Sequence, residues 1–268
     1  MNPSQAITPA LRAWVSEQRQ AGQSDERLRA AMLGKGWSAQ DADSALSEPG
    51  PKADKKLPTP DLSASPLYIT VGHQRIKVLQ TLEHPRIIVF GDVLSKNECE
   101  FLIAQARPRL ERSKVLGTDE DVVSNTRTSE GMFFHRQENE LIGAIEQRIA
   151  TLLQWPLEFG EGLQVLRYFP GAEFTPHHDY FEPVHFGKSL SRGGQRVATL
   201  IMYLHEPEQG GATIFPDINF SVFPTQGSAV FFSYDKPAPQ TLTLHGSAPV
   251  IAGEKWVVTK WLREREFT

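Results

Sequence analysis

The sequence predicts a mainly β protein of the α+β class, a β-sandwich or jelly roll supported by helices and preceded by a small helical bundle. Three observations lead to this prediction. The first 46 residues carry helical patterns, a proline-rich stretch follows them, and short β-forming runs separated by glycine- and proline-rich turns fill the chain beyond Leu163. Helices that precede a run of antiparallel strands are typical of a sheet that packs against helices.

Residues 1–46 predict the helical bundle. Ser24, which is followed by two acidic residues, has the character of a helix start, and Gly34 or Gly36 would end that helix. Ser38 is positioned to cap a further helix at the end of the bundle. We interpret this segment as a packing module, and binding of a protein partner through the bundle is the alternative.

Residues 47–66 change in composition to proline, serine, lysine and aspartate, as in Leu57-Pro58-Thr59-Pro60. Such a segment has little apolar surface to bury, so we expect a semi-extended linker. The remaining residues, 67–268, would then form the main domain, with its core at about residues 160–264.

In the main domain we expect two helices before the long run of strands. Ser95 is positioned to cap a helix that runs to Ala106, with Glu98 at the capping-box position. Apolar residues at helical spacing predict a second helix from about Glu138 to Leu153. The predicted strands that follow are Leu163–Phe169, Val197–Leu204, Ala229–Phe232, Thr241–Leu244 and Lys255–Trp261.

Composition and charge restrict the possible partners and the compartment. The formal net charge is −4, so the chain has no broad basic field for nucleic acid or an anionic membrane surface, and we expect neither as a partner. Cys99 is the only cysteine, which excludes an internal disulfide and fits a reducing compartment. The start of the chain lacks the pattern of a signal peptide, and no apolar run approaches the ~20 residues that span a bilayer. We therefore expect a cytoplasmic protein.

A candidate metal site lies in the segment that contains His177 and Asp179. Side chains at positions i and i+2 of a strand share one face, so these two can point together into the mouth of a barrel. A distant histidine would complete a set of two histidines and one carboxylate, and His245, which follows an apolar run, is the candidate. Such a set leaves three positions of an octahedral ferrous ion open, enough for a chelating 2-oxo acid and dioxygen.

A lysine ten residues after His245 supports this interpretation. Lys255 begins a predicted strand next to the one that leads to His245, where its cation can reach the distal carboxylate of a bound 2-oxoglutarate. The alternative for Lys255 is an exposed strand lysine.

Several segments, taken in order, strongly resemble the prolyl 4-hydroxylase family of the procollagen, plant and bacterial type. The resemblance covers roughly residues 85–264 and leaves the N-terminal 66 residues outside it. The matching segments are Ser124–Phe133, Leu163–Phe169, the His177 and Asp179 pair, Gln209–Pro216, and His245 together with Lys255–Trp261.

The resemblance implies a double-stranded β-helix, the cupin-like form of the jelly roll, and a role for each matching residue. Fe(II) would be bound by His177, Asp179 and His245, with no catalytic residue beyond the metal centre. The residues that would bind 2-oxoglutarate are Lys255, Tyr168 and Thr213, and those that would line the substrate groove are Glu161, Arg196 and Trp261. L-Ascorbate would keep the iron ferrous. Tyr168 and Trp261 are alternatively core aromatics, and Arg196 alternatively pairs with a surface carboxylate.

The function that the resemblance implies is an oxidoreductase, an Fe(II)- and 2-oxoglutarate-dependent dioxygenase. It would hydroxylate a proline in a peptide or protein with dioxygen and would convert 2-oxoglutarate to succinate and CO2. Residues 116–129 and 181–195 are expected to be loops that close over this peptide. The alternatives are a 2-oxoglutarate dioxygenase of a free amino acid or nucleic acid, a non-catalytic cupin-like binding protein, and a protein-interaction function of the N-terminal bundle.

Overall fold

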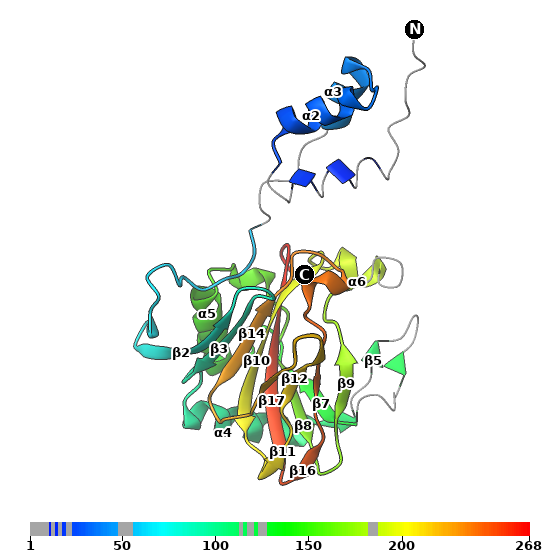
Figure 1. Cartoon of the computed structure of the whole chain (residues 1–268). Helices are drawn as coiled ribbons and strands as arrows, with labels where there is room; N and C mark the ends of the chain where they lie inside the picture. Colours follow the sequence, from blue (N-terminus) through cyan, green and yellow to red (C-terminus); the bar gives the residue numbers. More distant parts are fainter. Residues whose placement is uncertain are drawn as a thin grey trace. The chain divides into compact units, whose positions relative to one another are not determined.

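The structure, a computed structural model, describes residues 23–47, 56–112, 128–181 and 187–268, together with residues 11, 14–15, 18–19, 115–116 and 121–122. The chain divides into two compact units, Met1–Lys56 and Leu57–Thr268, which we describe separately (Figure 1). Outside the described residues lie residues 1–10, 12–13, 16–17 and 20–22 of the expected bundle, residues 48–55 of the expected linker, and residues 117–120, 123–127 and 182–186 of the two expected loops. The described part of the second expected loop, 181–195, contains a helical turn at Gly187–Ser191, so the expectation of a loop is wrong there. None of the described helices combines the length and the hydropathy needed to cross a bilayer.

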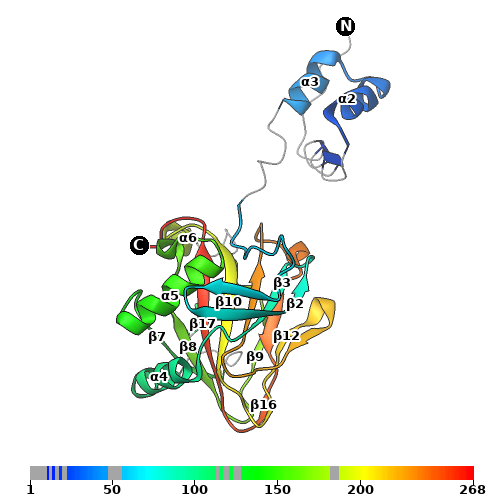
Figure 2. The same ribbon diagram turned by 90° about the vertical axis from the view of Figure 1, so that its left-hand side faces the viewer.

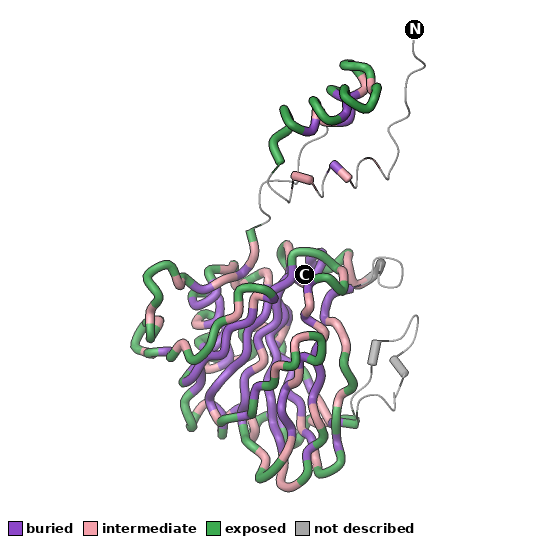
Figure 3. The backbone as a smooth tube through the Cα atoms, viewed as in Figure 1, coloured by how far each residue is buried: buried purple, intermediate pink, exposed green. Residues whose placement is uncertain are grey.

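The N-terminal unit contains the helices α2 (Asp25–Gly34) and α3 (Ala39–Leu46). As predicted, the side chains of Ser24 and Ser38 accept hydrogen bonds from backbone amides in the first turns of these helices. Met32 lies in a small apolar cluster with two buried alanines of α3. Most other positions of both helices are exposed, so this unit buries only one narrow face (Figure 3).

Among the described residues, the second unit contains three helices and seventeen strands. Its helices are α4 (Lys96–Ala106), α5 (Glu140–Leu152) and α6 (Gly187–Ser191), and its 3-10 turns are Arg107–Arg109, Leu157–Phe159, Pro216–Ile218 and Pro239–Thr241. Its strands are β1 (Tyr68–Val71), β2 (Gln74–Leu82), β3 (Ile87–Gly91), β4 (Glu111–Arg112), β5 (Val115–Leu116), β6 (Asp121–Val122), β7 (Glu130–Phe133), β8 (Gln164–Tyr168), β9 (Phe174–His177), β10 (Arg196–His205), β11 (Gln209–Gly210), β12 (Thr213–Phe215), β13 (Phe220–Val222), β14 (Ala229–Ser233), β15 (His245–Ser247), β16 (Val250–Ala252) and β17 (Lys255–Arg263).

Both helices expected in the main domain are present. Ser95 caps α4, and its hydroxyl and the Glu98 carboxylate form the predicted capping box. α5 begins two residues later and ends one residue earlier than the expected range of Glu138 to Leu153.

Two antiparallel sheets and a layer of helices form the architecture of this unit. The nine-stranded major sheet has the order β1-β2-β3-β14-β10-β17-β8-β7-β4, and the four-stranded minor sheet has the order β13-β12-β15-β9. The helices α4 and α5 cover one face of the major sheet, and the minor sheet lies on the other side (Figure 2). The prediction of a mainly β jelly roll supported by helices is confirmed.

The alternation of side chains along β17 separates two apolar layers. Trp256, Val258 and Leu262 belong to the large cluster between the major sheet and the helices. Val257, on the opposite face, belongs to the cluster between the two sheets. The residues at odd positions, Lys255 to Trp261, therefore face the space between the sheets.

The linker predicted from composition, residues 47–66, extends too far toward the C-terminus. Residues 57–66 belong to the second unit, where Leu57 and Leu62 pack against the main core. The amide of Thr59 donates to the carbonyl of Leu153 at 2.9 Å, which ties this segment to the end of α5. Proline prevents regular secondary structure but is itself apolar, so composition alone did not separate a packed segment from a free one.

The predicted strand Thr241–Leu244 is also wrong. Thr241 ends a 3-10 turn that begins at Pro239, and Leu242 adopts a left-handed backbone with φ of 53°. The strand starts instead at His245, four residues after the end of this turn. The turn breaks the extended backbone, so the apolar run before His245 does not pair as a strand.

A buried ion pair joins β17 to α5. Lys260 lies on the helix side of the sheet, and its Nζ is 2.5 Å from Oε1 of Glu146 and donates to the carbonyl of Glu161. The side chains of Lys260 and Glu146 are 2% and 0% exposed. Burial lowers the pKa of Lys260, and the Glu146 carboxylate opposes that effect.

Removal of the Glu146 carboxylate should destabilise this unit strongly. We expect Glu146→Ala to lower the free energy of unfolding by about 3–5 kcal/mol, because it leaves a buried ammonium without its carboxylate. The exposed neighbour Gln147→Ala is the control and should change it by less than about 0.5 kcal/mol. Urea unfolding measures both, and equal midpoints for the two variants would contradict this role of the pair.

Candidate functional site

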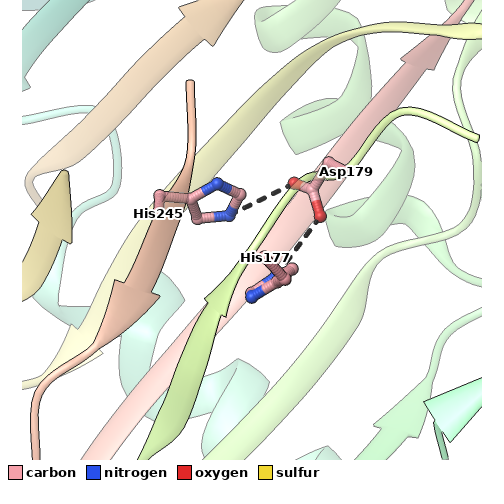
Figure 4. Close-up of side chains that lie close together, drawn as sticks. All are labelled: His177, Asp179 and His245. Carbon is pink, nitrogen blue, oxygen red and sulfur yellow. Dashed lines mark ion pairs between the residues drawn. The ribbon is translucent and has the colours of Figure 1, made fainter. Parts of the chain in front are cut away.

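Three side chains converge at one end of the minor sheet. His177 is the last residue of β9 and His245 the first of β15, and the register of the two strands places these residues opposite each other. Asp179 follows two residues after His177, and the rings of both histidines point toward its carboxylate (Figure 4). Nε2 of His177 lies 3.6 Å from Oδ1 of Asp179, and Nε2 of His245 lies 3.5 Å from Oδ2.

Hydrogen bonds on the far side of each imidazole fix its orientation. Nδ1 of His177 lies 2.9 Å from the carbonyl of Thr175, and Nδ1 of His245 lies 3.0 Å from the carbonyl of Thr243. A carbonyl only accepts, so each Nδ1 carries the proton and each Nε2 presents a lone pair to the centre. Two such lone pairs beside a carboxylate form a donor set that fits a divalent cation.

The electrostatics of the group agree with metal binding. Burial lowers the pKa of His245 to about 4, which keeps its imidazole neutral. Burial alone would raise the pKa of Asp179, but His245, His177 and Arg196 hold it well below its ordinary value. Among the described residues, these three are the one set of His, Cys, Asp and Glu side chains placed to share an ion. Two nitrogens and one carboxylate suit Fe(II).

The metal-binding group opens into a pocket between the two sheets. Its floor is formed by cross-strand neighbours of the major sheet, where Lys255 of β17 lies opposite Tyr168 of β8 and Thr259 lies opposite Gln164. Its roof is formed by the minor sheet. The pocket is lined by Gln164, Leu166, Tyr168, Phe174, His177, Asp179, Ile201, Thr213, His245, Gly246, Ser247, Lys255, Val257, Thr259 and Trp261.

Lys255 places an uncompensated cation at the inner end of this pocket. The side chain is buried, and its Nζ donates to Oγ of Ser247 at 2.8 Å. None of the carboxylates in the described part of the chain forms an ion pair with Lys255, and burial lowers its pKa to about 7. Thr213 lies opposite Ser247 in the minor sheet and also lines the pocket. A small dianion with one carboxylate here and the other end at the metal would fit this arrangement.

Comparison with known proteins identifies the family. Residues 163–263 match the family model of the 2OG-Fe(II) oxygenase superfamily. Prolyl 4-hydroxylase 1 of Arabidopsis thaliana is 45% identical over 201 residues, which cover 68% of this chain and 70% of that protein. The chain belongs to the prolyl 4-hydroxylase family. Probable prolyl 4-hydroxylase 3 of the same plant is 40% identical over 219 residues, 73% of this chain and 75% of the relative.

A solved structure agrees with this membership of the prolyl 4-hydroxylase family. The viral collagen prolyl hydroxylase of Paramecium Bursaria Chlorella virus-1, in complex with 2OG, superposes with a TM-score of 0.52 at 28% identity. The match covers 66% of this chain and 95% of the viral chain. The predicted double-stranded β-helix is confirmed, and the protein is a 2-oxoglutarate-dependent dioxygenase that uses Fe(II) and 2-oxoglutarate.

The structure brings together all six residues predicted for metal and 2-oxoglutarate. They line one pocket, and Lys255 is buried, so the alternative of an exposed strand lysine is wrong. Thr213 accepts a hydrogen bond from the hydroxyl of Tyr203 at 2.7 Å, which leaves the Thr213 hydroxyl proton for a ligand. Tyr203 is a neighbour of the pocket that sequence inspection did not identify.

The three residues predicted for the substrate groove also lie together. Of the three, Trp261 lines the pocket, and we call the end of the pocket at Trp261 its outer end. Arg196 forms two hydrogen bonds with the Glu161 carboxylate, at 2.6 and 3.0 Å, and its guanidinium lies 3.9 Å from the ring centre of Trp261. Arg263 donates to the same carboxylate at 2.6 Å. Burial alone would raise the pKa of Glu161, but the two guanidinium groups hold it below its ordinary value. The predicted carboxylate partner of Arg196 exists, although it is buried and not at the surface.

Sequence inspection did not identify two hydroxyl groups, those of Tyr234 and Thr199, that lie in series behind the Asp179 carboxylate; we call them the hydroxyl relay. Oγ1 of Thr199 donates to Oδ2 of Asp179 at 2.8 Å and lies 3.1 Å from the hydroxyl of Tyr234. Since the Thr199 proton goes to Asp179, Tyr234 donates to Thr199. All three side chains are buried. The sequence feature that could have indicated this relay is Thr199, a polar residue within the otherwise apolar run of β10. A buried hydroxyl of this kind needs a hydrogen-bond partner.

The relay should hold Asp179 in the orientation that binds the metal. We expect Thr199→Val to weaken binding of Mn(II), a redox-inert substitute for Fe(II), by about 10- to 100-fold, as is typical for groups that orient a ligand. Thr199→Ser keeps the hydroxyl and should bind Mn(II) nearly as the wild type does. Isothermal titration calorimetry measures both, and equal affinities for valine and serine variants would show that the relay does not act on the metal.

The low pKa of Lys255 predicts a pH dependence of 2-oxoglutarate binding. The charged ammonium, which prevails below pH 7, binds the carboxylate, so affinity should fall as the pH rises above the pKa of about 7. Between pH 7 and pH 8.5 we expect the dissociation constant to rise roughly tenfold or more. Calorimetry of the Mn(II)-loaded protein should also detect proton uptake on binding above pH 7.

The matched variant is Lys255→Met, which keeps the length of the side chain and removes its charge. It should weaken 2-oxoglutarate binding by about a hundredfold or more and abolish this pH dependence, while Mn(II) binding stays unchanged. An affinity of the wild type that is constant from pH 6 to 8.5, or a Met variant with wild-type affinity, would remove Lys255 from the binding site.

Proposed function

We propose that this protein hydroxylates a proline residue within an extended peptide or protein, with His177, Asp179 and His245 as the iron ligands. The observation that carries the proposal is the buried Lys255 ammonium in the same pocket as these three side chains. A non-catalytic cupin-like protein would have no reason to bury this cation without a carboxylate. The choice of proline rests on the relatives, which are named prolyl 4-hydroxylases.

The residues of the chain act by binding and orientation. When bound, the iron supplies the activation of dioxygen that is coupled to conversion of 2-oxoglutarate to succinate and CO2. Lys255, Tyr168 and Thr213 hold the distal carboxylate and thereby fix the position of the 2-oxo acid group. The apolar side chains Leu166, Ile201 and Val257 line the pocket between the two ends and exclude water. Tyr234 and Thr199 orient Asp179.

The outer end of the pocket has features of a peptide-binding groove. Nε1 of Trp261 is buried and has no hydrogen-bond partner within the described structure. A peptide carbonyl would accept from that N–H once binding moves the side chains that cover it. Arg196, stacked on the Trp261 ring, also donates to the backbone carbonyl of Asp179 at 3.4 Å. Arg196 would therefore connect the peptide-binding residue Trp261 with the metal-binding residue Asp179.

Three further points belong to the proposal. L-Ascorbate would restore the ferrous state after turnovers without peptide, and the protein would act in the cytoplasm. The second unit would carry catalysis by itself, because every residue of the site lies in Leu57–Thr268. A free amino acid or nucleic acid as substrate is the main alternative, and the experiment below separates them.

The test is a comparison of substrates. Purified protein with Fe(II), 2-oxoglutarate and ascorbate is incubated with short proline-rich peptides, free proline and single-stranded oligonucleotides, and products are analysed by mass spectrometry. We expect one added oxygen on a peptide proline, together with succinate. His177→Ala, Asp179→Ala and His245→Ala should each abolish succinate formation. Oxidation of the oligonucleotide or of free proline, with no peptide modified, would refute the prolyl-peptide assignment.

Trp261→Phe tests the peptide-binding end of the pocket. It keeps an aromatic ring and removes the N–H, so we expect the KM for peptide to rise about fivefold, the effect of one hydrogen bond of about 1 kcal/mol. Trp37→Phe, in the N-terminal unit, is the control. An unchanged KM for peptide in Trp261→Phe would show that the indole N–H does not contact the substrate.

A further inference from the structure

An exposed aromatic side chain borders the pocket without a role in the core. Phe133, the last residue of β7, is 51% exposed, although its neighbours Met132 and Phe134 are both buried in the main core cluster. Leaving a phenylalanine half exposed to water forfeits apolar burial. The position of Phe133 therefore needs an explanation other than folding.

The register of the major sheet places Phe133 on the pocket side. It lies opposite Gln164 of β8, which itself lies opposite Thr259 of β17, and both of these neighbours line the pocket. Side chains of adjacent strands at paired positions share a face. Phe133 therefore extends the row formed by Thr259 and Gln164 by one strand, from β8 to β7. Gly131, which faces the same side of β7, has no side chain there.

Phe133 and Trp261 form a pair at the outer end of the pocket. Their ring centres are 6.4 Å apart and the ring planes are inclined by 35°. Trp261 is 8% exposed and is covered on one face by Arg196, whereas Phe133 is largely open. The pair therefore offers one fixed ring and one accessible ring at the entrance.

We propose that Phe133 is a substrate-contacting specificity residue, which binds an apolar or proline side chain two positions away from the hydroxylated residue. The proposal rests on the proposed peptide hydroxylase function. An extended or polyproline chain advances by about 3.1–3.4 Å per residue, so the 6.4 Å between the two rings spans about two residues. Trp261 lines the pocket that contains the metal-binding residues, so we place the target proline against its ring. A peptide residue on the Phe133 ring would then be two positions away from the target proline.

The chemistry of Phe133 selects the class of residue that it binds. Its ring carries no hydrogen-bonding group, and the ring face favours contact with the apolar edge of a proline or with an aliphatic side chain. The enzyme should accordingly prefer peptides with proline or an aliphatic residue at this position over those with glycine or aspartate.

The experiment compares variants on a peptide series that differs two positions before and two positions after the target proline. Phe133→Ala should raise the KM for the preferred peptide about tenfold, with kcat changed less than twofold, and should remove the preference for proline over glycine at that position. Phe133→Tyr, which keeps the ring, should retain both the KM and the preference. Phe133→Leu, a second variant that keeps apolar volume, should show an intermediate KM.

Phe223→Ala is the matched control, because Phe223 is another exposed phenylalanine, 72% accessible, that makes no ring contact with a pocket residue in the described part of the chain. Its KM for peptide should equal that of the wild type. If the wild type hydroxylates peptides and Phe133→Ala does so with the same KM and the same preference, the inference is wrong while the proposed function stands. If the wild type modifies none of the peptides, the proposed function fails and the inference fails with it.

Discussion

Successive side chains of β17 point to opposite faces of the major sheet, and the rest of the site depends on this alternation. One face of this central strand packs on helices, and the other lines the pocket, so every residue from Lys255 to Trp261 is committed to one of two environments. The pocket face carries an ammonium at its inner end and an indole at its outer end. The helix face carries Lys260, which is paired with Glu146 of α5. A shift of register by one residue would exchange these environments and leave both lysines without their partners.

The two sheets contribute different parts of the chemistry. The minor sheet supplies the two histidines of the metal site, because the pairing of β9 with β15 places His177 opposite His245. The major sheet supplies the cation for 2-oxoglutarate and, through Thr199 of β10, the hydroxyl that orients Asp179. The active centre therefore exists only when the sheets pack face to face. The buried carboxylate of Glu161 nearby is paired with both Arg196 and Arg263.

Much of this arrangement follows from the sequence, and the failures have physical causes. The metal ligands could be identified because His177 and Asp179 are close in the sequence and the segments around them and around His245 resemble a known family. The strands assumed for them were only partly right, since β9 ends at His177 and the run before His245 is not a strand. Ser95 and Glu98 predicted the start of α4, since a capping box involves only neighbouring residues. The relay from Tyr234 through Thr199 could not be predicted, because these residues are 35 positions apart and meet only in the folded sheet. The position of Phe133 at the pocket entrance depends on the registers of three strands, which no local pattern specifies.

The central claim is that one pocket holds a metal at His177, Asp179 and His245 and a dicarboxylate at Lys255. A crystal structure of the protein with Mn(II) and 2-oxoglutarate tests it most directly. The account predicts Mn(II) bound to Nε2 of both histidines and to the Asp179 carboxylate, with the 2-oxo acid end of the ligand on the metal. It also predicts the distal carboxylate within hydrogen-bond distance of Lys255 Nζ. Mn(II) at other residues, or 2-oxoglutarate bound away from Lys255, would contradict it.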